Sequence, residues 1–443
     1  MAAKNAVIIV VAGLVCTSTA HGAAVNRVKG HKASPAVRPA PSLAPSPVRV
    51  APKTLSEALD ANDVAGAQAF LKNGGDPNES APDGSTILGK AIVMDDLPFV
   101  KLLVEAHADV DRADKAGQRP LDHAIDVGQL DMVDYLIANH ANVNYTATSG
   151  QTPLMLAIDY ERTPLVKVLV DAGADVNAVE EDAGTTPLHR AVGVRSTEIV
   201  AMLLAHKADI NARDKEGDTP LKMAISSEQV AVAKALLDAK ADVALVDNRG
   251  NSPLHAAVGS RNLDMLTLLL NYNPPLDVAN NDGDSPLYLA TVNGHGGMLT
   301  ALLYKGADPN TANAKLFTPL MEASKSNRFD MVGVLLAMKA SVDIRQYGGW
   351  SAFMVAVSAD RLGIAAVLLE HGANINAQST DKYNSRTSLM LAAMNGRKDA
   401  VDFLIDKGAN LYLRDSDGHT ALDLANLHDH TEIAALLRAR MGN

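Results

Sequence analysis

A spacing of 33 residues governs the chain after residue 53 and constrains its fold more than any other feature. The spacing is carried by a marker residue, usually Leu, that follows Thr-Pro or a similar pair. Successive markers lie 33 residues apart, with one step of 34 and one of 36. Such a period is typical of solenoids, in which each unit buries its apolar face only against its neighbours. The markers are Leu55, Leu88, Leu121, Leu154, Leu188, Leu221, Leu254, Leu287, Leu320, Phe353, Leu389 and Leu422.

Each unit carries signals for two short helices. Thr or Ser supplies an N-cap acceptor, and Pro at the first helical position, as in Thr186-Pro187, loses no hydrogen bond. Apolar pairs such as Leu203-Leu204 indicate a second helix. Gly173 and its equivalents, 19 residues after the marker, are expected to end that helix in the left-handed conformation. Asp-x-x-Gly segments such as 214–217 predict a tight turn before the next unit.

These units resemble ankyrin repeats. Thr186-Pro187-Leu188-His189 with Lys207-Ala208-Asp209-Ile210-Asn211 is close to the family's signature, and Ser252-Pro253-Leu254-His255 is similar. The resemblance covers about residues 53–443. It implies an all-α repeat solenoid of about 11–12 helix-turn-helix units with short β-turn or hairpin tips. It also implies that the two histidines of these motifs bridge neighbouring turns by hydrogen bonds.

Some units depart from this pattern in ways that affect local geometry and not the fold class. One residue is inserted near 182–184 and three near 379–386. Several expected left-handed helix ends lack Gly, at a cost of about 1 kcal/mol each. These are His107, His140, Lys207, Lys240, Asn273 and Lys339.

The first 20 residues are predicted to be a signal peptide. Lys4 precedes an apolar run over 7–15, and small residues at 18–20 favour cleavage. The 16 uncharged residues from 5 to 20 are few for a membrane span of about 20 residues. An uncleaved anchor and a lipoprotein acylated at Cys16 are the alternatives. The predicted location is periplasmic or secreted, with no transmembrane segment after cleavage.

Residues 21–53 form a Pro/Ala-rich basic linker, and residues 54–443 form the repeat domain. The linker is expected to be an extended tether. The alternative is that its positive charge contacts an anionic envelope surface. Residues 1–53 contain seven Lys and Arg and no acidic residue, so the remainder carries a net charge of −18. Such an acidic domain argues against nucleic-acid binding and accommodates a basic partner, or the linker itself, more easily.

We find no residue pattern that indicates catalysis, a metal or a cofactor. Cys16 is the sole cysteine, and the repeats use every residue after the linker, so no segment is left for a catalytic domain. His428-Asp429-His430 could hold a metal, but a polar turn between helices is the favoured interpretation. The carboxylate groups at 95–96 and 180–182 are interpreted as solvated turns.

The resemblance implies that a partner docks on the concave face, formed by the turn tips and the exposed side of each first helix. Side chains three and six positions before the marker should be free to vary on these tips. Four aromatic residues on three successive tips are therefore predicted to bind a partner, with mutual packing as the alternative. They are Phe317, Tyr347, Trp350 and Tyr383.

A second, acidic candidate set lies near the ends of two first helices and suits a basic partner. It consists of Asp126, Asp159, Tyr160 and Glu161. The predicted function is a non-catalytic scaffold in the periplasm of a bacterium or outside the cell, binding one or more partner proteins. A dedicated inhibitor or protector of an envelope enzyme, a structural tether and an enzyme built on the repeat surface are the alternatives.

Overall fold

The computed structural model describes residues 52–147, 150–380, 382 and 384–442. The predictions for the leader and most of the linker, Cys16 included, lie outside the described residues. The repeats belong to a compact unit that begins at Pro52. In the described part of the chain, 24 helices are present, and the β-structure there consists of two isolated bridges, Ser80 with Thr86 and Gln378 with Thr387.

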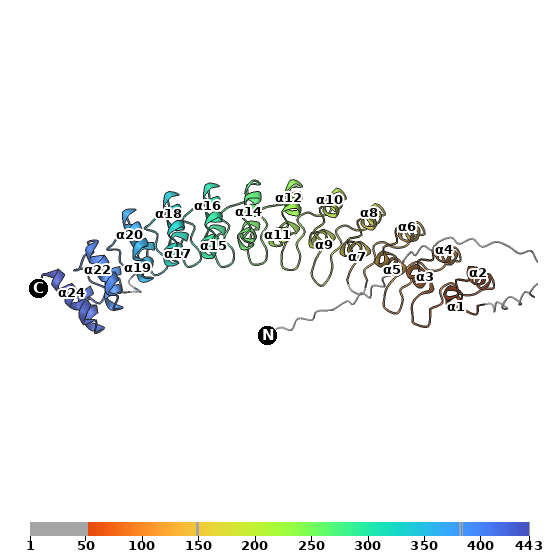
Figure 1. Cartoon of the computed structure of the whole chain (residues 1–443), viewed down its shortest axis with the longest axis horizontal. Helices are drawn as coiled ribbons and strands as arrows, with labels where there is room; N and C mark the ends of the chain where they lie inside the picture. Colours follow the sequence, from red (N-terminus) through yellow and green to blue (C-terminus); the bar gives the residue numbers. More distant parts are fainter. Residues whose placement is uncertain (1–51, 148–149, 381, 383, 443) are drawn as a thin grey trace, which may run out of the picture. The chain divides into compact units, whose positions relative to one another are not determined.

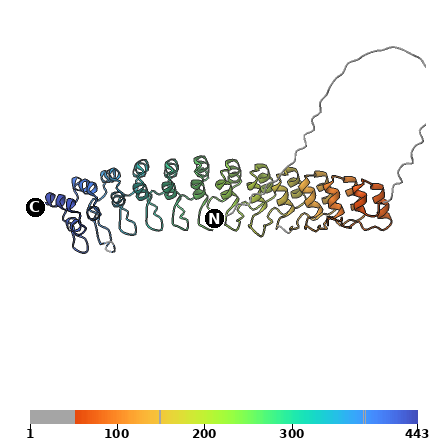
Figure 2. The same ribbon diagram turned by 60° about the horizontal axis from the view of Figure 1, so that its bottom comes forward.

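The helices form twelve pairs, numbered here as repeats 1–12 in chain order, which confirms the predicted solenoid. Figure 1 shows the first and second helices of the pairs in two parallel rows, with the turn tips along one side, and Figure 2 shows the same rows from a second direction. The first helices are α1 Leu55–Asp60, α3 Ile87–Val93, α5 Pro120–Val127, α7 Pro153–Asp159, α9 Pro187–Gly193, α11 Pro220–Ser226, α13 Pro253–Gly259, α15 Pro286–Asn293, α17 Pro319–Lys325, α19 Ala352–Ser358, α21 Ser388–Met394 and α23 Ala421–Leu427. The second helices are α2 Val64–Lys72, α4 Leu97–Glu105, α6 Leu130–Ala138, α8 Thr163–Asp171, α10 Thr197–Ala205, α12 Val230–Asp238, α14 Leu263–Leu270, α16 Gly296–Tyr304, α18 Phe329–Ala337, α20 Leu362–Glu370, α22 Lys398–Asp406 and α24 Thr431–Met441.

The first helices begin where the sequence predicts. Thr152 Oγ1 accepts a hydrogen bond from the Met155 N–H at 3.3 Å, and Pro153 occupies the first position of α7. Thr219 and Pro220 start α11 in the same way. These caps satisfy donors that would otherwise lack a partner at the helix start.

A column of alanines lets neighbouring first helices approach closely. The residue three positions after each marker is Ala in all twelve repeats, and each is at most 3 % exposed. A larger side chain would push successive repeats apart, because interiors are packed with little free space. The column consists of Ala58, Ala91, Ala124, Ala157, Ala191, Ala224, Ala257, Ala290, Ala323, Ala356, Ala392 and Ala425.

The second helices end in the left-handed conformation, as predicted. Their end positions have φ between 52° and 102°, and this holds for Lys207 and Asn273 as well as for Gly173. A second left-handed column, seven residues after each marker, was not predicted. Gly128, Gly294 and Gly396 in this column are the sequence signal for positive φ that could have identified it, whereas Arg195 and Glu228 give no such signal.

A ladder of side-chain to backbone hydrogen bonds joins successive repeats after their second helices. Asn177 Oδ1 accepts from the Asp209 N–H at 2.7 Å, and Asn211 Oδ1 accepts from the Asp242 N–H at 2.9 Å. One interruption of this ladder lies between repeats 6 and 7. There Ala244 offers no side-chain acceptor, and Pro275, at the donor position, has no N–H. Because the acceptor and the donor are both absent, the missing rung leaves no unsatisfied hydrogen-bonding group at this junction.

We predict that Ala257→Leu destabilises the domain. The added atoms would enter the closely packed column between first helices, and overpacking of this kind costs roughly 1–3 kcal/mol. The midpoint of urea unfolding, followed by circular dichroism, should fall. Ala231→Leu, on the exposed face of α12, is the matched control and should leave the midpoint nearly unchanged. Equal midpoints for the two variants would show that the column has spare volume.

Candidate interaction surface

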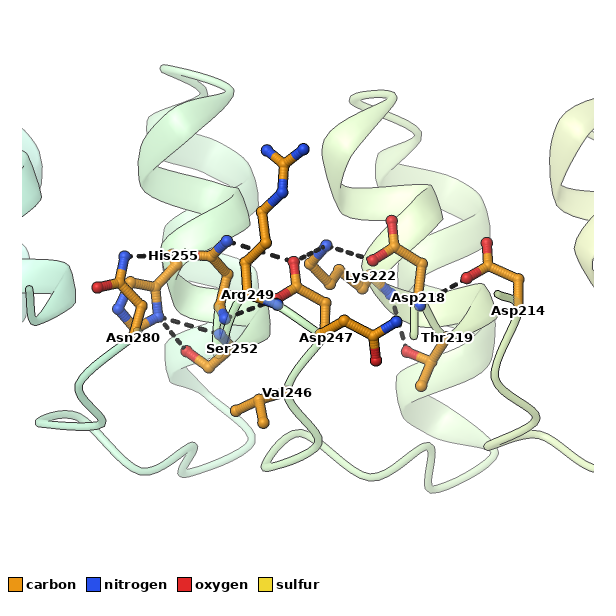
Figure 3. Close-up of polar contacts among 12 residues, drawn as sticks. Asp214, Asp218, Thr219, Lys222, Val246, Asp247, Arg249, Ser252, His255 and Asn280 are labelled. Carbon is orange, nitrogen blue, oxygen red and sulfur yellow. Dashed lines mark hydrogen bonds and ion pairs between the residues drawn. The ribbon is translucent and has the colours of Figure 1, made fainter. Parts of the chain in front are cut away.

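Buried polar contacts fix the bases of the tips on which a partner would dock (Figure 3). The ring of His255 in α13 accepts through Nδ1 from the Ser252 N–H at 3.0 Å. Its Nε2 lies 2.9 Å from the Asp284 carbonyl oxygen of the next repeat, so it donates there. His189 makes the equivalent contact with the Asp218 carbonyl oxygen at 3.1 Å. The predicted bridging role of both histidines is confirmed.

Burial lowers the pKa of His189 and of His255 below the usual value of 6.5, although the carbonyl contacts oppose this effect. Both rings are therefore neutral in the fold near neutral pH. A ring with one nitrogen accepting and the other donating needs this neutral form. The two side chains hold neighbouring turns together, and their ring nitrogens are engaged within the protein.

Lys222 takes the place of this histidine in repeat 6, where its side chain is 10 % exposed. Its Nζ lies 2.7 Å from Asp247 in repeat 7 and also contacts Asp218 (Figure 3). Burial would lower the pKa of Lys222, but the hydrogen bonds to Asp218 and Asp247 outweigh it and raise the pKa above its usual value. Burial would likewise raise the pKa of Asp247, but Lys222 and the Asn251 amide groups hold it below its usual value.

The other repeats supply replacements that test this ion pair. Lys222→Met would leave the buried Asp247 carboxylate without its cation, and Met occupies the same position in repeats 4, 9, 10 and 11. We expect a loss near the lower end of the roughly 3–5 kcal/mol typical of broken buried pairs, since Asp218 is partly exposed. Adding Asp247→Asn should restore most of it, because Asn280 accepts the same turn hydrogen bonds in repeat 8. Urea unfolding of the two single variants and the double variant measures the coupling between Lys222 and Asp247. If the loss of unfolding free energy in the double variant equals the sum of the two single losses, the two side chains are not coupled.

We predict that acidification destabilises the domain through the buried histidines. Their pKa values are lower in the fold than in the unfolded chain, so the unfolded state binds more protons below about pH 6.5. Their contribution is complete above that pH and is lost as the pH falls. The melting temperature should therefore decrease from pH 7.5 to 5.5. The decrease should be smaller in His189→Met/His255→Met, even though that variant is less stable at pH 7.5. An equal decrease in both proteins would assign the effect to other groups.

The four aromatic residues predicted to bind a partner differ in exposure. Tyr347 is 66 % exposed, and Lys382 Nζ lies 5.3 Å from the centre of its ring. Phe317 is half-buried and packs against the core. Trp350 is half-buried and, with Met354 among others, lines a cavity of about 20 Å³ between repeats 10 and 11. Tyr383 lies outside the described residues. Tyr347 is thus the most accessible of the three described aromatics, and the partner-binding role of all four remains a prediction.

Leu316, which lies beside Phe317 at the tip of repeat 9, was not among the predicted residues. It is 49 % exposed and has φ +59°. The Tyr347 N–H donates to the Lys315 carbonyl oxygen at 3.3 Å, which joins this tip to the next. The absence of Gly four residues before the marker was the signal that could have identified it.

The structure separates the acidic candidate set into two parts. Asp159 is paired with Arg190 at 2.8 Å, so much of its charge is compensated within the protein. Asp126, Tyr160 and Glu161 are exposed. A hydrogen bond with Asp126 raises the pKa of Tyr160, which places these two side chains together. The role of this set in binding remains a prediction.

Tyr160 also belongs to an apolar row that was not predicted. The residue six positions after the marker is Met94, Val127, Tyr160 and Val194 in repeats 2–5, and we call these four residues the apolar strip. The first three are 49 %, 42 % and 45 % exposed, and Val194 is half-buried. They lie at the ends of first helices that pack against one another in succession, so they form a row. Repeats 6–9 have polar residues there, namely Ser227, Ser260, Asn293 and Ser326.

One group among the described residues has metal-ligand spacing, namely Asp415, Asp417 and His419. Asp415 already accepts from the N–H groups of Asp417 and His419, at 3.0 and 2.8 Å, and pairs with Arg386. It therefore organises the last tip. In the motif at 428–430, His430 Nε2 contacts the Met394 carbonyl oxygen at 3.0 Å, in line with the predicted turn. Within the part of the chain that the structure describes, none of the helices is long and apolar enough to cross a membrane.

Comparison with known proteins gives a match to the family model "Ankyrin repeats (3 copies)" over residues 55–147, 154–247, 232–313, 311–379 and 376–442. The chain is 38 % identical over 72 residues to the probable E3 ubiquitin-protein ligase XBOS34 of Oryza sativa subsp. japonica, a match that covers 16 % of this chain and 14 % of that protein. It is 40 % identical over 73 residues to the E3 ubiquitin-protein ligase hecd-1 of Caenorhabditis elegans, covering 16 % and 3 % respectively. These matches therefore span a small part of either relative. Among solved structures, the ankyrin repeat domain of Bcl-3 is 30 % identical with a TM-score of 0.47, covering 50 % of this chain and 100 % of that one.

Proposed function

Because the chain belongs to the ankyrin-repeat family, whose repeats indicate a protein–protein interaction scaffold, we propose that it is a non-catalytic scaffold that binds a partner protein through its concave face. We place its action in the periplasm of a bacterium or outside the cell. The predicted leader at 1–20 supports this location, as does the absence of cysteine from the sequence after residue 16, since free thiols are a liability in oxidising compartments.

The apolar strip is the observation that carries the proposal. Contiguous exposed apolar side chains are uncommon on soluble proteins and mark interaction sites. Here apolar residues occupy one position in four successive repeats, whereas the next four repeats have Ser or Asn at the same position. The strip thus distinguishes repeats 2–5 from repeats 6–9, which have the same helix pairs but polar side chains at this position.

The charges beside the strip favour a particular partner. Three exposed acidic residues, Asp95, Asp126 and Glu161, lie directly before or after strip residues, against one exposed basic residue, Arg195. The domain as a whole is strongly acidic. Complementary charge increases the rate of association and excludes partners of like charge. The partner segment should therefore combine apolar side chains with Lys or Arg.

We predict that Val127→Ser/Tyr160→Ser weakens partner binding at least tenfold, because it gives repeats 3 and 4 the polar residue of repeats 6 and 7. The partner would first be identified by affinity purification of the full-length protein from an envelope extract with mass spectrometry. Its dissociation constant would then be measured by calorimetry. The melting temperature should change little, since surface substitutions generally alter stability by no more than about 0.5 kcal/mol.

Ser260→Ala/Ser326→Ala is the matched control, at the same position in repeats outside the strip. It should bind as the unaltered protein does. Unchanged affinity of the Val127→Ser/Tyr160→Ser variant would remove the strip from the binding surface. If the captured partner is an enzyme, its activity in the complex distinguishes an inhibitor from a tether.

A further inference from the structure

Leu316 departs from a rule that the other tips follow. The turn position four residues before the marker has positive φ in every repeat from 2 to 12, and Leu316 has φ +59°. A branched side chain is unfavourable in this left-handed conformation. Leu316 and Ser385 are the exceptions to Gly, which occupies the position at Gly84, Gly117, Gly150, Gly184, Gly217, Gly250, Gly283, Gly349 and Gly418.

The side chain of Leu316 gains little from burial that could offset this backbone conformation. It is 49 % exposed, so a large part of its apolar surface stays in water. Gly would fit the backbone at this position better and would expose less apolar surface. A residue that is unfavourable in both respects suggests a role outside the folding of the domain.

A second exposed apolar side chain comes from the adjacent tip. Tyr347 is 66 % exposed, and its N–H donates to the carbonyl oxygen of Lys315, the residue before Leu316. The two tips are thus held in a fixed relation by the backbone. Leu316 and Tyr347, which we call the apolar pair, therefore project from neighbouring tips that are joined to each other.

The charges around the apolar pair are positive. Lys315 is exposed, and the Lys382 ammonium group lies over the Tyr347 ring at 5.3 Å. Lys325 lies 5.7 Å from the centre of the Phe317 ring, although it is also 3.5 Å from Glu322. The tip segments 311–318 and 344–351 contain one Lys and one Arg between them and no acidic residue. The next tip segment, 380–387, which carries Lys382, contains two basic residues and one Asp, whereas the preceding one, 278–285, contains two Asp and no basic residue.

We propose that the apolar pair and its lysines form a second docking site, which takes an extended protein segment that presents apolar side chains beside Asp or Glu. The charge of this site is opposite to that of the apolar strip. The site therefore goes beyond the proposed function, because one scaffold would hold two segments of different chemistry. A basic segment, which suits the strip, is disfavoured here by Lys315 and Lys382.

A phage-displayed library of random 12-residue peptides, selected against the full-length protein, tests this proposal even while the natural partner is unidentified. Clones would be eluted with 0.5 M NaCl and counter-selected on the Leu316→Gly protein. Peptides that depend on Leu316 should combine Asp or Glu with Leu, Phe or Trp. Their affinity, measured by fluorescence anisotropy, should fall with increasing salt concentration. A selection that yields no Leu316-dependent binder, or yields basic ones, would overturn the proposal.

Leu316→Gly separates binding from stability. It should raise the melting temperature, because Gly suits the left-handed turn, and it should weaken the selected peptides at least tenfold. Tyr347→Ala should weaken them to a similar degree with little change in melting temperature.

Lys339→Gly is the matched control, because it relieves a left-handed residue at the end of the second helix in the same repeat, away from the tip. It should raise the melting temperature and leave peptide affinity unchanged. The Val127→Ser/Tyr160→Ser protein should bind these peptides normally, so failure of the apolar strip and failure of this site give different results. Unchanged peptide affinity in Leu316→Gly would contradict the proposal.

Discussion

The close contact between successive first helices is the constraint on which the rest of this structure depends. A single helix pair buries only part of its apolar surface, so each repeat completes its core against its neighbours. The alanine at the same position of all twelve first helices sets their separation. This contact allows side chains at the tips and helix ends to differ from repeat to repeat without changing the backbone that presents them.

Polar contacts between repeats add directional links to this apolar contact. At the base of the tips, His189 and His255 link neighbouring repeats through uncharged hydrogen bonds, whereas Lys222 does so through a buried ion pair. After the second helices, Asn and Asp side chains accept from the next repeat. Different side-chain chemistry thus serves one geometric purpose at the position after the marker, where both His and Lys reach the next repeat.

Much of the fold could be predicted because its determinants are local and recur. Thr-Pro caps, alanines and the 33-residue spacing appear in unit after unit, and each has a direct physical meaning. Positive φ at Arg195 or Glu228 could not be predicted from the residue itself, because neither Arg nor Glu favours the left-handed conformation. The candidate surface was harder to predict than the fold. The sequence located the aromatic tips but could not show that Trp350 and Phe317 are half-buried while Tyr347 is exposed, since exposure depends on contacts between repeats. The apolar strip becomes visible in the sequence once the repeats are aligned on their markers, but Met94 and Val127 are ordinary core-type residues whose exposure is known only from the structure.

Because a ladder rung is missing between repeats 6 and 7, this junction is held more firmly on its tip side than on the side of the second helices. On the tip side, Lys222 and Asp247 join the two repeats through buried charges, which resist separation. On the opposite side, Ala244 and Pro275 leave the ladder without a rung, and an exposed hydrogen bond from the Tyr272 hydroxyl to Asp238 at 2.6 Å joins the second helices of the two repeats. An exposed hydrogen bond resists separation less than a buried ion pair does, so a bend at this junction would open the outer row of helices more readily than it would separate the tips.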